Sequence, residues 1–99
     1  MTMVDEKIRV LHVRLNKTFT IRLWEDRTTA FRWHLEYDSS VLSLTDEDFE
    51  RTSIASTVDA GNRIFEFKAL RAGSHTIQIS KRMGVVAAEE HRFFQVVVE

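Results

Sequence analysis

The amino-acid sequence predicts an antiparallel β-sandwich of seven to eight strands in a single domain, 1–99. Three observations favour this fold class. Apolar and polar side chains alternate with a period of two, the alternating runs recur at intervals of about ten residues, and no stretch has the 3.6-residue period of an amphipathic helix. A chain of 99 residues, 43% of them apolar and 29% charged, can enclose one core but not two.

The first half of the chain contains four alternating runs. They predict strands at 11–15, 18–23, 31–38 and 41–44. A tight turn at Asn16 and Lys17 is expected to join the first two strands. The third strand has a heavily aromatic face, and an acidic surface segment at 45–51 follows the fourth.

The second half of the chain continues the same pattern. Further strands are predicted at 52–58, where the run is short and irregular, and at 64–69, 76–80 and 94–98. Turns are expected at 58–62 and 72–75, where Gly, Asn, Asp and Ser gather. The chain has no proline, and each of its three glycines, Gly61, Gly73 and Gly84, is expected to mark a turn.

The apolar phase of the alternating runs predicts the core. A slip of one residue would expose the whole set, so its members should face inward together. Trp33 is expected to pack between the two sheets, as a tryptophan on the third strand does in many sandwiches. The predicted inward-facing side chains are Leu11, Val13, Phe19, Ile21, Trp33, Leu35, Phe65, Phe67, Ile77, Ile79, Phe94 and Val96.

Composition restricts the classes of partner. Fourteen Lys and Arg against 15 Asp and Glu give a net charge of −1, without the basic surface that binding to nucleic acid or anionic membranes requires. We therefore expect no nucleic-acid or membrane partner, and a monomer. With no cysteine, disulfides and thiol nucleophiles are excluded. Charges at 5–7 occupy the place of a signal peptide's apolar stretch, so we expect an unexported chain, cytoplasmic by default.

No catalytic or cofactor motif is present. The four histidines, His12, His34, His75 and His91, show no metal-ligand spacing and are expected at the surface. A Gly-rich phosphate loop and a nucleophile elbow are both missing. We therefore expect no enzyme, no metal and no cofactor.

Three segments have the spacing of a known family. Residues 11–23 match its opening strand, turn and second strand. Asp26-Arg-Thr-Thr-Ala-Phe-Arg-Trp33 matches a loop of the form Asn-Pro-Thr-Thr-Gly-aromatic-x-Trp, and Ala72-Gly-Ser-His75 matches a turn before the sixth strand. On these residues the chain resembles the chagasin family over nearly its whole length. The resemblance implies an immunoglobulin-like sandwich that inhibits papain-like cysteine peptidases, its partners, by inserting three loops into the active-site cleft.

The resemblance also assigns the three loops, which fall at 26–30, 58–61 and 81–85. The family's third-loop motif, Arg-Pro-Trp, falls on 82–84 or on 83–85. The residues implied to bind the peptidase are Asp26, Arg27, Thr28, Thr29, Ala30 and Phe31 of the first loop, Ala60 and Gly61 of the second, and Arg82, Met83 and Gly84 of the third.

Several family positions are altered in this chain. Arg27 replaces a Pro and Ala30 a Gly, only Gly61 remains of a Gly-x-Gly-Gly loop, and the third loop lacks its Pro and Trp. We therefore expect weaker inhibition than the family pattern implies. If the family Gly needs a positive φ, Ala30 should be strained, and restoring the Pro and the Gly should tighten binding. The alternative function is a non-inhibitory, immunoglobulin-like interaction module whose loops have drifted.

Overall fold

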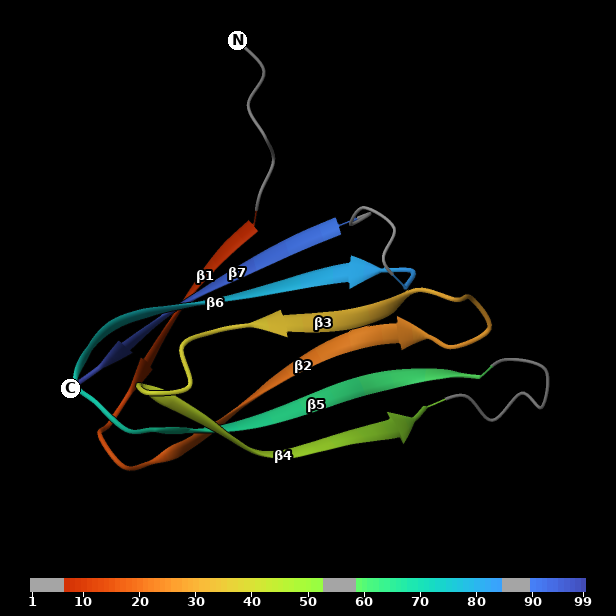
Figure 1. The fold of residues 1–99 in the computed structure, drawn as a ribbon. Coiled ribbons are helices and arrows are strands. Elements are labelled where there is room, and N and C mark those ends of the chain that lie inside the picture. The colour runs from red at the N-terminus through yellow and green to blue at the C-terminus, as the bar shows by residue number, and fades with distance from the viewer. Residues whose placement is uncertain (1–6, 53–58, 85–89) are drawn as a thin grey trace, which may run out of the picture.

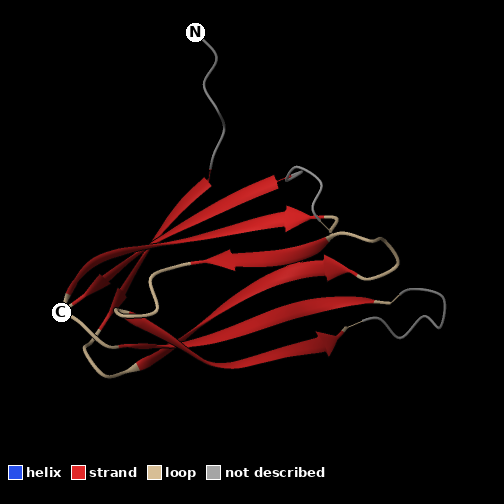
Figure 2. Ribbon diagram, in the orientation of Figure 1, coloured by secondary structure: helices blue, strands red, loops and turns tan. Residues whose placement is uncertain are grey.

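The computed structural model of the chain describes residues 7–52, 59–84 and 90–99. Seven strands form two sheets that face each other (Figures 1 and 2), which confirms the predicted sandwich. In chain order they are β1 (Lys7–Val13), β2 (Thr18–Asp26), β3 (Arg32–Glu36), β4 (Leu42–Arg51), β5 (Ala60–Ala69), β6 (Gly73–Arg82) and β7 (Glu90–Val98). The part of the chain that the structure describes holds no helix able to span a membrane.

One pair of neighbouring strands departs from the antiparallel arrangement. One sheet has the order β1-β7-β6-β3 and the other β2-β5-β4. Every pair is antiparallel except β1 and β7, which run parallel, with Val13 opposite Val98. The expectation of antiparallel pairing throughout is therefore wrong for β1.

The turn after β1 explains this exception. The tight turn predicted at Asn16 is present, but it takes the chain from one sheet to the other instead of closing a hairpin. Asn16 has a φ of 67°, a conformation that asparagine tolerates better than most residues. Its backbone N–H donates to the carbonyl of Ala69 on the three-stranded sheet (2.8 Å), and that of Leu15 donates to Glu99 beyond β7 (2.9 Å). The turn is thus bonded on both sides of the sandwich, and Leu15 is left exposed.

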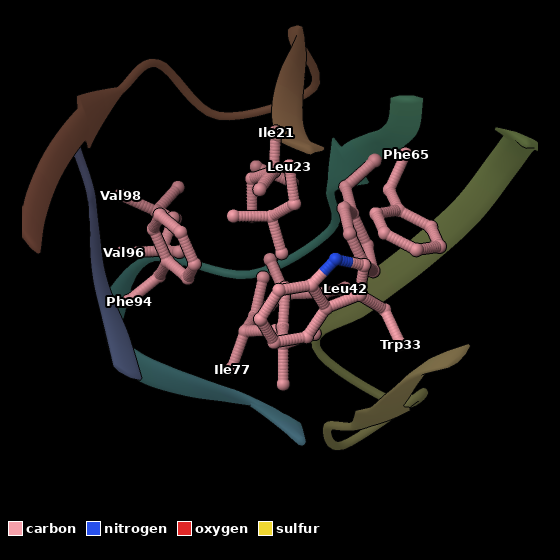
Figure 3. Close-up of a cluster of buried hydrophobic side chains, with 12 residues drawn as sticks. Ile21, Leu23, Trp33, Leu42, Phe65, Ile77, Phe94, Val96 and Val98 are labelled. Carbon is pink, nitrogen blue, oxygen red and sulfur yellow. The ribbon is translucent and has the colours of Figure 1, made fainter. Parts of the chain in front are cut away.

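The core lies between the sheets (Figure 3), and its composition confirms the predicted inward phase. Four predicted members, Leu11, Val13, Phe19 and Leu35, are partly buried and pack against it. The fully packed set contains all the others and adds Leu23, Leu42, Ala69 and Val98; its members are Ile21, Leu23, Trp33, Leu42, Phe65, Phe67, Ala69, Ile77, Ile79, Phe94, Val96 and Val98.

β4 is longer than predicted. The acidic residues 45–51 are exposed for the most part, as expected, but they continue the strand that was predicted to end at Leu44. A register shift between Leu44 and Asp46 marks a bulge in the pairing with β5. Beyond it, the strand places Asp46, Glu47, Asp48 and Glu50 at the surface. Consecutive acidic residues are therefore compatible with an edge strand that is solvated on both faces.

Gly61 has a different role from the predicted one. The turn expected at 58–62 is wrong for its last three residues, which belong to β5. Gly61 lies opposite Arg51 of β4, and a Cβ atom there would lie 2.0 Å from the carbonyl oxygen of Glu50. Glycine is required here because the two backbones approach closely, not because the chain turns.

The other two glycines do mark turns. Gly73 has a φ of 123° and begins β6 directly after a bend at 71–72, and Gly84 has a φ of 57° just after β6. Both turn predictions are confirmed. The irregular strand predicted at 52–58 lies outside the described residues, apart from Thr52, which is in no strand.

Candidate functional site

The candidate loop joins β2 to β3 at one end of the sandwich. It spans 27–31, from the end of β2 to the start of β3. β4 and β6 end, and β5 and β7 begin, at the same end (Figure 1). The topology therefore gathers the ends of six strands around this loop. The family resemblance, which implies three binding loops at one end of the sandwich, requires such an arrangement.

Asp26 organises the loop from its base. Its Oδ1 accepts hydrogen bonds from the backbone N–H of Thr28 (2.9 Å) and from the hydroxyl of Thr28 (2.5 Å). The hydroxyl of Thr29 donates to the carbonyl of Asp26 (3.0 Å) and accepts from the backbone N–H of Phe31 (3.3 Å). Both threonine hydroxyls are thus used inside the loop, where they hold its backbone in one shape.

These bonds affect the charge on Asp26. The hydroxyl and the backbone N–H of Thr28 stabilise the carboxylate and lower the pKa of Asp26 from its ordinary value. Because the folded pKa lies below the unfolded one, the carboxylate stabilises the loop at every pH above the ordinary Asp range. That contribution is lost as the pH falls through the folded pKa.

Two arginines connect the loop to the rest of this end. The backbone N–H of Arg27 donates to the carbonyl of Asp59 just before β5 (2.7 Å), and its guanidinium lies 3.7 Å from the centre of the Phe49 ring. Arg32 donates to the carbonyls of Thr29 and Phe31 (both 2.7 Å). The sequence analysis missed Arg32, which supports the loop's outer carbonyls.

Asp59 belongs to the same group. Its carboxylate accepts from Arg51 Nε at the end of β4 (2.7 Å), and this hydrogen bond lowers the pKa of Asp59. The segment before β5 is thereby tied both to β4 and, through the Asp59 carbonyl, to Arg27. The candidate loop is therefore braced from the three-stranded sheet.

A buried carboxylate, Glu25, lies directly beneath the loop. It is 1% exposed and accepts from Arg63 Nη1 (3.0 Å), from Arg27 Nε (3.1 Å) and from the backbone N–H of Trp33 (3.0 Å). Arg63 also pairs with Glu47 of β4. Glu25, at the end of β2, is therefore bonded to β5 through Arg63 and to the start of β3 through Trp33.

The sequence carries a signal for Glu25 beyond the strand predicted at 18–23. Ile21 and Leu23 face inward, and the same period of two places Glu25 inward as well. A charged residue in the apolar phase of a strand indicates a buried polar network, because an unpaired charge could not remain there.

Trp33 confirms the core prediction. It is 4% exposed, and its indole N–H donates to the carbonyl of Trp24 on β2 (2.7 Å). The cationic groups of Lys81 and Arg92 lie 5.8 and 5.4 Å from its ring. The tryptophan thus fixes the start of β3 to the opposite sheet, immediately behind the loop.

The structure brings only part of the predicted site together at the surface. Thr28, Thr29 and Ala30 are exposed, and Asp26, Arg27 and Phe31 are half-buried at the base of the loop. Ala60 and Gly61 are buried within β5. They offer no surface to a partner, so their assignment as contact residues has to be corrected.

The third predicted loop is described only in part. Arg82 is the last residue of β6, and its guanidinium lies 3.7 Å from Glu36 of β3. Met83 is 39% exposed, and Gly84 follows in a turn. Residue 85, in the alternative register, lies outside the described residues. Among those that are described, no group of three or more His, Asp and Glu could hold a metal ion.

Comparison with known proteins decides the family. The sequence model described as chagasin family peptidase inhibitor I42 matches residues 12–98. The chain belongs to the chagasin family. This confirms the predicted family and its class, a peptidase inhibitor and not an enzyme. The match spans β2 to β7 and the last two residues of β1. No curated protein matches the sequence.

Solved structures share the chagasin-family fold. The cysteine protease inhibitor EhICP2 of Entamoeba histolytica superposes with a TM-score of 0.78 at 20% identity, covering 98% of this chain and 100% of that one. PbICP-C, in a complex with falcipain-2, gives 0.71 at 12% identity, covering 96% and 90%. Amebosin gives 0.68 at 16% identity, covering 91% and 88%. The immunoglobulin-like sandwich is therefore confirmed.

Proposed function

We propose that this chagasin-family chain inhibits papain-like cysteine peptidases by laying the loop 26–31 across the active-site cleft. The observation that supports the proposal most directly is the internal bonding of this loop around Asp26. Inhibition by a loop requires that its backbone be held in a shape that the enzyme cannot attack. Among the structural relatives, EhICP2 is a cysteine protease inhibitor and PbICP-C forms a complex with falcipain-2.

Preorganisation is what makes such a loop effective. A flexible loop would lose conformational entropy on docking and would also relax into a cleavable conformation. Here Asp26 and the two threonines bond the loop internally, Arg32 holds two of its carbonyls, and Arg27 ties it to Asp59. The exposed tip, Thr28 to Ala30, is then free to meet the enzyme with little further ordering.

The flanking contacts are weaker than in the family pattern. The third loop lacks the family Trp: with the motif on 82–84, Gly84 stands at that position, and the exposed Met83 is the apolar side chain beside it. Loss of a Trp anchor from an interface costs about 2 kcal/mol or more, which corresponds to more than roughly 20-fold in affinity. The proposed contact residues are Asp26, Arg27, Thr28, Thr29, Ala30, Phe31, Arg82, Met83 and Gly84.

A substitution at Ala30 tests contact without disturbing the loop. The side chain of Ala30 is exposed and plays no part in the hydrogen bonding that holds the loop. Ala30→Arg should therefore leave the melting temperature unchanged. It should raise the inhibition constant for papain about tenfold or more, because a long charged side chain would have to be accommodated at the centre of the interface. The measurement is a titration of papain activity on a fluorogenic substrate.

The matched control for Ala30→Arg is Ser39→Arg. Ser39 is exposed in the turn between β3 and β4, at the opposite end of the sandwich. It should inhibit papain as the unaltered chain does. Equal inhibition by both variants would place the contact elsewhere. Failure of the unaltered chain to inhibit at tens of micromolar would favour the alternative, a non-inhibitory interaction module.

The structure reverses the expected effect of restoring the family's Pro and Gly. Among the described residues other than glycine, only Asn16 has a positive φ, so Ala30 is not strained. Arg27→Pro would remove the N–H that donates to Asp59, the guanidinium bond to Glu25 and the cation–π contact with Phe49. We therefore expect Arg27→Pro to cost at least about 1 kcal/mol of stability and to weaken papain inhibition.

Ala30→Gly is the comparison for Arg27→Pro. It should leave papain inhibition the same or slightly weaker, since the added backbone freedom relieves no strain. Thermal melts and inhibition constants would be measured for both variants. Tighter inhibition by either of them, with the fold intact, would show that our account of the loop is wrong.

A further inference from the structure

An arginine-lined hollow opens on the side of the sandwich, between the edge strands β1 and β2. Two adjoining cavities of about 110 and 240 Å³ lie there. Both are lined by Arg9 of β1, Arg22 of β2 and Phe94 of β7. The smaller one is completed by Leu23, Arg92 and Phe93, and the larger one by Leu11, Thr20 and Ile21. We call this pair of cavities the β1–β2 seam.

Two of its arginines occupy positions where the sandwich would ordinarily place apolar side chains. Arg9 lies opposite Phe94 in the pairing of β1 with β7, in the same phase as Leu11 and Val13, which pack against the core. Arg92 precedes Phe94 by two residues and shares its inward phase. The seam therefore has guanidinium groups above a floor of buried apolar side chains.

The charge of the seam is one-sided. Among the described residues, no acidic side chain lines either cavity. Arg22 pairs at 3.0 Å with Glu50, but both side chains are more than half exposed, and such pairs exchange readily with solvent and other ions. Arg92 pairs with Glu90, outside the lining (2.7 Å). Like charges gathered in one hollow favour an anion, and guanidinium groups bind carboxylates in a bidentate manner.

We propose that the β1–β2 seam binds an amphipathic carboxylate, a carboxylate group attached to a short apolar chain. Arg9 and Arg22, the two arginines common to both cavities, hold the carboxylate. The apolar chain lies over Leu11, Ile21 and Phe94. The combination of an apolar floor with a few convergent polar groups is typical of small-molecule sites. Nothing in this inference depends on the peptidase-binding loop.

The test is a titration of the whole chain with sodium octanoate, in which two-dimensional NMR spectra record the shifts of the backbone amide signals. Octanoate should cause saturable shifts with a dissociation constant of about a millimolar, the strength expected for a ligand of this size. Arg9→Gln and Arg22→Gln should each weaken binding at least roughly fivefold, since each removes one charged partner of the carboxylate. The matched control is Arg71→Gln: Arg71 is exposed in the bend before β6, lines neither cavity, and its variant should bind as the unaltered chain does.

Two further ligands separate the parts of the proposal. Octanol should bind much more weakly than octanoate, and acetate more weakly still, because each lacks one of the two recognised features. Three outcomes would each overturn the proposal. Octanol could bind as well as octanoate, Arg71→Gln could lose as much affinity for octanoate as Arg9→Gln, or the shifts could fail to saturate. Melting curves of all variants establish that they are folded. Papain is absent from the assay, so its outcome is separate from that of the inhibition experiments.

Discussion

Trp33→Ala should lower the free energy of unfolding by about 3 to 5 kcal/mol, a large part of the roughly 5 to 15 kcal/mol available to a domain of this kind. The indole is 4% exposed and belongs to the core, so its removal leaves a cavity between the sheets. It also leaves the carbonyl of Trp24 without the hydrogen bond that it accepts from the indole N–H at 2.7 Å. We expect little folded protein at 37 °C.

The chain offers a matched control for this variant. Trp24 is 53% exposed on the outer face of β2, so Trp24→Ala removes the same side chain without opening a cavity. Urea unfolding followed by far-ultraviolet circular dichroism would compare the two variants. If the two variants had unfolding free energies within about 1 kcal/mol of each other, the assignment of Trp33 to the core would be wrong.

Glu25→Ala should have an effect of similar size for a different reason. Glu25 is the common acceptor for Arg63, Arg27 and the backbone N–H of Trp33. Removing one partner of a buried ion pair typically costs about 3 to 5 kcal/mol, because the other charge remains buried without compensation. Arg63 is only 12% exposed but would keep its pairing with Glu47 and its contact with the Phe65 ring, so we expect the lower end of this range. Papain inhibition should weaken as well, since the loop rests on this network.

Glu50→Ala is the control for the loss of a carboxylate. Glu50 pairs with Arg22 at the surface, where both side chains are more than half exposed. Removing such a pair should cost less than about 1 kcal/mol. Glu25→Gln should fall between the two, because the amide oxygen can still accept from the backbone N–H of Trp33. Chemical unfolding of the three variants gives the comparison, and equal losses for Glu25→Ala and Glu50→Ala would refute the buried network.

Much of the fold could be predicted from the sequence because its apolar residues repeat with a period of two. That period places Ile21, Phe65 and Ile77 on one face of each strand, and it leads to a sandwich whenever both sheets are half apolar. The candidate loop was found through the resemblance of 26–33 to the family motif, and the hydrogen bonds among Asp26, Thr28 and Thr29 that shape it are local in the chain. Local interactions of this kind depend little on the rest of the fold.

The remaining features are decided by contacts between segments far apart in the chain. The parallel pairing of β1 follows from where the turn at Asn16 finds its partners, Ala69 among them. Gly61 resembles a turn residue in the sequence, but the backbone of β4 lies too close to it for any side chain. The burial of Glu25 depends on donors from other segments, above all Arg63, which is 38 residues away in the chain. The sequence alone determined which faces are apolar, and the tertiary structure decided which polar groups meet, since a partner brought by another strand leaves no periodic signal.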